Sequence, residues 1–453
     1  MKKWRYSSEE QKINNVLNYQ KKQLEEIHHI DMKQTEECIK ESEDLLLSLG
    51  YGLPTKSRNK MVKKCKTIVV PEWDQLCKEA EKSVGSNTTL DMLFTKEEIE
   101  NNHVAIKLMQ QEFDSLYHLD QTDIMISAFS GLLTATVDIL LIGIPKKTHS
   151  GIKAGFLSDY IRTYFYRKYP EEELKKLADQ GISKVPYDAQ DNRNTVENVK
   201  GLSSYYHRLL SLGHDPLLGF IFGVKDILNG TMTTIDKEGK YVSQVMENYA
   251  DRKEQNVFDA IAKQIIHLKT DLTTSMGLPV PGMALFNKLQ IGSIGVEEQT
   301  VAEIVQGMYY EGYDFIHFCS MPLSVMLIEA SVRMGYAFKS LNEGYTIKES
   351  IPFSRKPEKK AKLQTMLFIA HTVATAINAG KITFSKNPLA INYVQWLVFI
   401  RYTWKQLNWV FIKKPMMKEH YINNMIFYDL QNVYEDIDDL MKEYDENSIF
   451  VFE

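Results

Sequence analysis

The chain has 453 residues, and the 44% that are hydrophobic suffice for a sizeable core. Its 54 basic and 59 acidic residues give a net charge of −5, which excludes a general electrostatic attraction to nucleic acid, so no nucleic-acid partner is indicated. Four cysteines without a C-x-x-C pair, and a charged start with no apolar segment behind it, favour a cytoplasmic protein with reduced thiols.

The first quarter of the chain has the pattern of polar helices. Thr95 and Glu98 have the spacing of a capping box, which predicts that a helix begins beside them. A short strand is predicted over 66–70. We therefore expect two domains: a polar helical N-terminal region over 1–119 and a larger glycine-rich helical domain over 120–453.

The larger domain alternates apolar, small-residue-rich blocks with polar connectors. The blocks cover 124–144, 217–228, 276–294, 315–338, 366–379 and 393–412. Residues 231–243 alternate around a turn and predict one small β-hairpin. The sequence thus predicts a mainly α-helical fold with a single hairpin in the larger domain.

A glycine–aspartate pattern occurs twice, with the aspartate seven residues after the glycine. The glycine, the small residue and the aspartate of each copy are, in order, Gly131, Ala135 and Asp138, then Gly219, Gly223 and Asp226. Seven residues make two helical turns, so each set is predicted to share one helix face at a close helix crossing. We expect the two copies to pack together or to occupy equivalent places.

The two aspartates interrupt apolar segments. If Asp138 and Asp226 are buried, each needs a cationic or hydrogen-bonding partner, or an elevated pKa. The alternative is that both carboxylates lie at helix ends and face water.

Three apolar blocks raise the question of a membrane. The block at 124–144 has the length of a bilayer-spanning helix, whereas 217–228 is too short and is interpreted as a buried or re-entrant helix. The block at 315–338 is long enough but contains Glu329 and Arg333, spaced for an ion pair. A mean hydropathy of −0.30 favours a soluble chain, in which the glycines allow core helices to cross closely.

The last apolar block carries Trp404 and Trp409. Basic residues lie among and just after them, namely Arg401, Lys405, Lys413 and Lys414. This mixture is typical of a membrane-interface belt or a partner groove. The alternative is a core helix whose tryptophan N–H groups have hydrogen-bond acceptors.

No familiar catalytic motif is present, so no catalytic, cofactor-binding or metal-binding residue is assigned, and the cofactor stays unknown. Scattered polar residues could still converge in one pocket and ligate a metal or run acid–base chemistry. They are His207, His214, His317, Glu329 and His371, together with Asp138 and Asp226. The alternatives are that Asp215 and Pro216, after His214, simply begin a helix and that His371 is a hydrogen-bonded core residue.

Four segments carry a resemblance to known sequences. They are LGHDPLLGFIFG at 212–223, MGLPVPGMALFN at 276–287, GYDFIHF at 312–318 and the stretch 378–393. Together they resemble an uncharacterised family of mainly helical bacterial proteins, over roughly 123–409. The resemblance implies a bacterial source and assigns neither an activity nor a site residue.

Three functions are compatible with these features. The leading hypothesis is a non-enzymatic bacterial effector that interacts with membrane lipid or with itself, in the cytoplasm or at the periphery of the inner membrane. Its setting would be conflict with mobile elements, a guess drawn from the resemblance. The alternatives are a soluble helical scaffold or binding protein, and an enzyme with an Asp/His pocket. The ligand is not identified by the sequence.

Overall fold

The computed structural model describes residues 6–28, 32–51, 61–65, 71–149, 151–179, 183–274, 276–294, 297–350 and 356–452. The chain forms two compact units, one of Met1–Leu116 with Lys414–Glu453 and one of Tyr117–Lys413. The predicted division at 119/120 placed 414–453 in the larger domain, whereas the compact units group these residues with the N-terminal segment. The strand predicted over 66–70 lies outside the described residues.

The smaller unit consists of helices and one pair of strands. Its elements are α1 (Ser8–His28), α2 (Met32–Ser48), β1 (Met61–Cys65), α3 (Trp73–Val84), η1 (Leu90–Leu93), α4 (Lys96–Leu116), α17 (Lys414–Asn447) and β6 (Ser448–Phe452). Strands β1 and β6 pair in parallel, from Met61 with Ser448 to Cys65 with Phe452. Helix α1 packs on α3, and α4 packs on α17.

Helix α4 begins where the capping box predicts. The Thr95 N–H donates to Glu98 Oε2 at 2.7 Å, and the Glu98 N–H donates to Thr95 Oγ1 at 3.2 Å. Near its end, Asp114 pairs with Lys414 and Lys418 of α17 at 2.9 and 2.7 Å. These contacts connect the last helix of the chain to the N-terminal segment.

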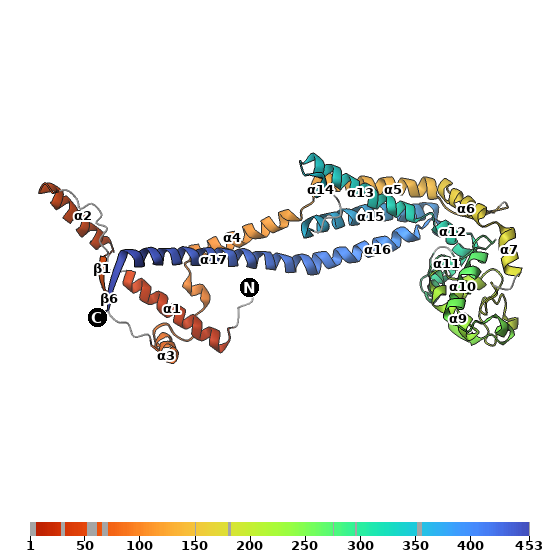
Figure 1. Cartoon of the computed structure of the whole chain (residues 1–453), viewed down its shortest axis with the longest axis horizontal. Coiled ribbons are helices and arrows are strands. Elements are labelled where there is room, and N and C mark those ends of the chain that lie inside the picture. The colour runs from red at the N-terminus through yellow and green to blue at the C-terminus, as the bar shows by residue number, and fades with distance from the viewer. Residues whose placement is uncertain are drawn as a thin grey trace. The chain divides into compact units, whose positions relative to one another are not determined.

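Four long helices form a bundle in the larger unit. They are α5 (Gln121–Val137), which continues into the π-helical segment η2 (Asp138–Ile142), α13 (Pro322–Asn342), α15 (Pro357–Ser385) and α16 (Tyr393–Asn408), followed by the π-helical η9 (Trp409–Lys413). Figure 1 shows α5, α13 and α15 side by side, and α16 packs on α15 and α13. Ile328, Val332 and Met366 are among the fully buried side chains between them.

The rest of the larger unit is made of short helices and two hairpins. These elements are β2 (Lys146–Thr148), β3 (Gly151–Lys153), α6 (Phe156–Lys168), α7 (Glu171–Asp179), η3 (Asn192–Asn194), α8 (His207–Leu210), η4 (Leu212–His214), η5 (Leu218–Phe220), α9 (Phe222–Asn229), β4 (Thr231–Ile235), β5 (Tyr241–Val245), η6 (Glu247–Arg252), α10 (Val257–Asp271), η7 (Met283–Lys288), α11 (Val301–Tyr310), α12 (Phe315–Phe318), α14 (Ile347–Ser350) and η8 (Pro388–Ala390). The mainly helical fold is confirmed, and β4 with β5 is the expected hairpin. The β2–β3 and β1–β6 pairs were not predicted.

Gly131 lies at a close helix crossing, as predicted for the first copy of the pattern. A Cβ atom at this position would lie 2.6 Å from the Ala370 carbonyl oxygen and 2.7 Å from Val373 Cβ. A side chain here would therefore push α5 away from α15. Ala135, one turn further, is also buried.

The second copy differs from the prediction, because Gly219 and Asp226 do not share a helix. Gly219 lies in the 3-10 turn η5, which ends at Phe220, and α9 begins as a separate element at Phe222. The cause is Asp215, whose Oδ1 accepts the N–H groups of Leu217 and Leu218 and starts a separate turn there. Gly219 also packs against Gly213 and Gln264 rather than against a bundle helix, so the expectation of equivalent places is wrong.

Both repeat aspartates are buried and have partners, as expected, and the alternative of water-facing carboxylates is wrong. Asp138 pairs with Lys381 at 2.9 Å and accepts from Asn378 and Asn392 at 3.0 and 2.8 Å. Asp226 accepts from the Thr233 N–H at 2.8 Å and from the hydroxyls of Thr231 and Thr233. Burial raises the pKa of Asp226, and these hydrogen bonds oppose the rise.

Candidate functional site

Five histidine and aspartate side chains meet in the part of the larger unit outside the bundle. Asp188 lies in the connection between α7 and η3, His207 begins α8, and His214 ends η4. His267 and Asp271 lie one turn apart on α10, so both project from the same helix face. We call these five residues the His–Asp cluster.

The donor atoms of the His–Asp cluster are evenly spaced. His207 Nε2 and His214 Nε2 each lie 3.5 Å from Asp188 Oδ1. His214 Nε2 and His267 Nε2 lie 3.6 and 3.5 Å from Asp271 Oδ2. Ligands held at about 2.1 Å from one ion at tetrahedral angles lie about 3.4 Å apart, so the spacing within each of the two triads that share His214 suits ligands of one metal ion.

These atoms have no other hydrogen-bond partner, although they are buried. Within the part of the chain that the structure describes, His207 Nε2, both ring nitrogens of His214, His267 Nε2 and Asp271 Oδ2 are all without one. Buried polar groups are normally satisfied, so unsatisfied atoms gathered in two overlapping triads, Asp188–His207–His214 and His214–His267–Asp271, require an explanation. A metal ion held by a triad would supply the missing partner for its Nε2 and carboxylate atoms.

The outer nitrogens of two histidines fix their rings. His207 Nδ1 lies 3.0 Å from the Ser204 carbonyl oxygen, and His267 Nδ1 lies 2.8 Å from the Ser183 carbonyl oxygen. A hydrogen on Nδ1 leaves the Nε2 lone pair directed into the cluster, which is how metal-binding histidines are usually held. Asp271 is oriented similarly, because its Oδ1 accepts from Arg208 Nη2 at 3.0 Å.

His214 is held in place by the close packing of Tyr187 and Gln264 against it and against Gly213. The Tyr187 ring meets His214 edge to face at 5.1 Å between centroids, and its hydroxyl donates to Gln264 Oε1. Gln264 Nε2 in turn donates to the Gly213 carbonyl oxygen at 2.7 Å. Because a Cβ atom at Gly213 would lie 2.6 Å from the Tyr187 ring, only glycine fits immediately before His214.

The two glycines of the second repeat copy pack against Gln264 as well. A Cβ atom at Gly219 would lie 2.6 Å from Gln264 Nε2, and one at Gly223 would collide with Gln264 Oε1. Both positions therefore let η5 and α9 approach α10 one turn before His267. Gly219 and Gly223 thus have the packing role that the sequence predicts, but their partner is Gln264, the side chain that supports the His–Asp cluster.

The electrostatics of the cluster favour neutral His207 and His214 beside an ionised Asp188. Burial lowers the pKa of His214 to about 4 and also lowers the pKa of His207. Burial alone would raise the pKa of Asp188, but its contacts with His214 and the charges of the neighbouring histidines bring this pKa below its ordinary value. Both forms are the ones that bind metals.

A polar cavity of about 360 Å³ opens onto the cluster. Asp188, His267 and Asp271 line it together with Arg208 and Lys184. Its remaining lining residues are Glu171, Leu174, Lys175, Asp179, Ser183, Thr270, Thr273 and Thr274. Three of the five donors therefore face a space large enough for a small substrate.

Of the polar residues expected to converge, only His207 and His214 do so. His317 Nδ1 contacts the Ser158 hydroxyl at 2.8 Å, a separate buried site. His371 lies in the bundle, where its Nδ1 is 3.2 Å from Gln395 Nε2, in agreement with the core alternative. The other candidates are also apart from the cluster, since Glu329 pairs with Arg333 on α13, as the spacing predicted, and Asp138 and Asp226 have the partners given above.

The two tryptophans differ in their surroundings. Trp404 is 72% exposed on α16, whereas Trp409 is half-buried and its ring lies 5.0 Å from that of Tyr117. Trp396, on the same helix, donates its indole N–H to Asn378 Oδ1 at 3.0 Å. Helix α16 therefore combines a packed face with an exposed aromatic one.

Asp188, His267 and Asp271 were not singled out from the sequence. His267 and Asp271 carry a weak signal, because two ligand-type residues at i and i+4 on a helix face the same way. Asp188 carries none, since it is a single loop aspartate nearly twenty residues before His207. Only the fold brings these three segments together.

Acid should destabilise the protein through His317. Burial first, and then the charges of Arg162 and Lys381, lower its pKa to about 3, whereas an unfolded histidine titrates near 6.5. As the pH falls below about 6.5, His317 binds a proton in the unfolded chain but not in the folded chain. The free energy of unfolding therefore falls by about 1.4 kcal/mol per pH unit. Between about pH 7.5 and pH 5, His317→Asn should therefore lose about 2 kcal/mol less than the wild type in urea unfolding. His103→Asn, an exposed control, should follow the wild type; equal pH dependence in all three proteins would contradict this prediction.

Comparison of the chain with protein-family models, curated proteins and solved structures finds no match. The resemblance seen in the sequence therefore identifies no family, and the protein is described by its own features as mainly helical.

Proposed function

We propose that the larger unit is a divalent-metal-dependent hydrolase with its metal at the His–Asp cluster. The observation that carries this proposal is the set of buried, unsatisfied donor atoms of His207, His214, His267 and Asp271, spaced at 3.5–3.6 Å around Asp188 and Asp271. A purely structural cluster of this kind would leave several buried polar atoms without partners, at a cost in free energy for each.

The donor set indicates the class of metal. Each triad offers two imidazole nitrogens and one carboxylate oxygen, with no thiolate, and this set suits first-row divalent ions such as Zn²⁺, Mn²⁺ or Fe²⁺. Such an ion lowers the pKa of bound water and polarises a carbonyl or phosphoryl oxygen. The chain's own contribution would be to orient the ligands through Ser183, Ser204 and Arg208 and to hold the substrate in the polar cavity.

The polar cavity supports a catalytic rather than a purely structural metal. Structural zinc sites are usually closed and rich in cysteine, whereas catalytic sites keep a face open to substrate. Here Asp188, His267 and Asp271 line an opening that also contains Arg208 and Lys184. With Asp188 and Asp271 neutralised by a metal, the three cationic lining residues outnumber the two remaining acidic ones, and this balance favours a substrate with an anionic group.

Metal analysis tests the proposal. The purified chain, dialysed against Zn²⁺ or Mn²⁺, should retain about one equivalent, and His267→Ala should bind at least ~100-fold more weakly because it loses a direct ligand. His371→Ala, also a buried histidine, is the matched control and should bind like the wild type. Absence of retained metal in the wild type would refute the site.

Hydrolysis of chromogenic phosphate and carboxylate esters tests the reaction class. The wild type should hydrolyse at least one of them only with metal bound. Lys184→Ala should keep the metal while its activity changes, because Lys184 lines the cavity and belongs to no ligand pair. A protein that binds metal but has no metal-dependent hydrolysis would instead have a structural metal.

A second candidate function, association with a membrane, is supported by the polarity of the bundle. Windows of 18 residues within Lys96–Ile142 and Phe315–Asn342 are apolar enough to cross a bilayer, with mean hydropathies of 1.9 and 1.6, and only 33% and 39% of them is buried. Large apolar side chains on the outer faces are more than half exposed or nearly so. They are Met125, Phe129 and Leu132 on α5, Leu140 on η2, Met326, Met334 and Phe338 on α13, and Leu397, Ile400 and Trp404 on α16.

Polar residues occupy the inside of the same bundle. Ser127, Ser130 and Thr134 of α5 are buried, and so are His371 and Asn378 of α15. These polar residues lie beside the apolar core of Ile328, Val332 and Met366, and exposed apolar faces over a partly polar interior are typical of helices in lipid. We therefore propose that the bundle binds a lipid bilayer or a second copy of itself through its outer face.

Flotation with liposomes that contain acidic lipid tests this candidate. The wild type should float, more strongly at low salt because the exposed Arg401 and Lys413 would be attracted to the surface. Trp404→Ala and Phe129→Asn should each bind roughly tenfold more weakly, the equivalent of about 1.4 kcal/mol. Phe258→Asn is the matched control, because Phe258 is 85% exposed but lies on α10. Wild-type protein that stays in the soluble fraction at every salt concentration would exclude the lipid partner.

A further inference from the structure

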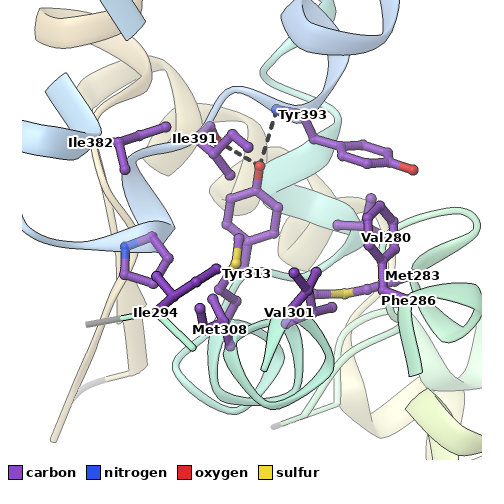
Figure 2. Close-up of a pocket in the computed structure, with 13 residues that line it drawn as sticks. Val280, Met283, Phe286, Ile294, Val301, Met308, Tyr313, Ile382, Ile391 and Tyr393 are labelled. Atoms are coloured by element: carbon purple, nitrogen blue, oxygen red, sulfur yellow. Dashed lines mark hydrogen bonds between the residues drawn. The ribbon is translucent and has the colours of Figure 1, made fainter. Parts of the chain in front are cut away.

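A second cavity, with apolar walls, lies at the base of the bundle. It has a volume of about 220 Å³, and Figure 2 shows its lining side chains converging from η7, α11, η8 and the ends of α15 and α16. Val280, Met283, Val305 and Tyr313 form a buried floor. Ile294, which is 48% exposed, lies at the rim.

The polar atoms near this cavity are directed away from it. The Tyr313 hydroxyl donates to the Ile391 carbonyl oxygen at 2.6 Å and accepts the Tyr393 N–H at 3.2 Å (Figure 2). Tyr313 therefore lines the cavity with its aromatic ring and not with its hydroxyl. The Tyr393 ring packs against Phe286, with centroids 5.9 Å apart. The space is thus lined by aliphatic, methionine and aromatic surface.

We propose that this cavity binds a medium-length alkyl chain, the apolar part of an amphiphilic molecule. Protein interiors are close-packed, with few voids larger than a water molecule, so an unfilled space of this size is unusual. An apolar cavity of about 150 Å³ stays dry and binds benzene or xenon, and this one is larger. Water would find no hydrogen-bonding partners there.

The walls favour an alkyl chain over a rigid ring. Met283 and Met308 have flexible side chains that adapt to an occupant, and Ile304 and Ile382 offer aliphatic surface. The exposed Ile294 and Pro388 mark the end at which a polar head group would remain in water. The cavity shares no lining residue with the polar cavity of the His–Asp cluster, so this inference is independent of the proposed hydrolase.

Methionine methyl NMR tests the proposal with n-octanol as the probe. In full-length protein labelled at the methionine methyl groups, octanol should shift the Met283 and Met308 signals in a saturable way. Met326 and Met334 are exposed on α13 and report on binding to the outer face of the bundle, so their signals should stay in place. Each signal is assigned by a methionine-to-leucine substitution.

A filled cavity provides the control. Val305→Phe places a ring in the space and should abolish the octanol shifts of Met283 and Met308. Ile304→Phe, at a half-buried position of the same wall, should weaken binding at least tenfold and is the second variant if Val305→Phe does not fold. Shifts at all four methionines together, or none at the solubility limit of octanol, would overturn the proposal.

Discussion

Replacing Asp138 by alanine should destabilise the helix bundle by about 3–5 kcal/mol, because it leaves the Lys381 ammonium buried without its counter-charge. The side chains of Lys381 and Asp138 are only 9% and 7% exposed. Asp138 also accepts from Asn378 of α15 and from Asn392, which caps α16 and donates to Ser324 of α13. One carboxylate therefore joins all four helices, and urea unfolding should show its loss.

A double variant distinguishes a lost ion pair from general damage. Asp138→Ala with Lys381→Met removes both charges, so it should be less destabilising than Asp138→Ala alone. Asp259→Ala, at the exposed start of α10, should have little effect. If Asp138→Ala unfolds within about 1 kcal/mol of the wild type, the carboxylate does not hold the helices together.

Stripping the metal should lower the stability of the larger unit by about 4 kcal/mol, if the ion had been present at about a thousand times its dissociation constant. The reason is that the folded chain alone gathers the three imidazoles and two carboxylates, so binding energy stabilises the folded state. Thermal unfolding with and without a chelator measures this difference, and addition of Zn²⁺ should restore the higher melting temperature.

A cluster variant and a control separate this effect from direct action of the chelator. His267→Ala should melt at the same temperature with and without the chelator, because it has little metal to lose. His371→Ala should respond like the wild type. An unchanged melting temperature of metal-free wild type would contradict the predicted stabilisation, while the site itself would still be judged by the metal analysis.

Local signals predicted the helical fold well. The Thr95–Glu98 box marks the start of α4, and the alternation over 231–243 forms the β4–β5 hairpin, because both depend on neighbours along the chain. The β1–β6 pair could not be foreseen, since it joins strands almost four hundred residues apart. The equal Gly–Asp spacing of the two copies did not predict equal structure, because Asp215 ends η4 and starts the separate turn η5, which contains Gly219, before α9 begins.

The candidate site could be predicted only in part. The sequence indicates His207 and His214 because both immediately precede the second glycine-rich block. His317 and His371 were chosen on polarity alone, and each has a hydrogen-bonding neighbour in a different part of the unit. Asp188, His267 and Asp271 reach the cluster through tertiary packing around Tyr187 and Gln264, which no local pattern encodes.

The parallel pairing of β1 with β6 has a consequence for synthesis on the ribosome. Strand β1 and helix α4 belong to the first part of the chain, whereas their partners β6 and α17 begin only at Ser448 and Lys414. At about 5–20 residues per second, the Phe113 side chain of α4 would stay uncovered for roughly 15–60 s before Tyr421 of α17 is made. The larger unit is complete before that time, so the nascent N-terminal segment is a natural client for chaperones that shield apolar helices during translation.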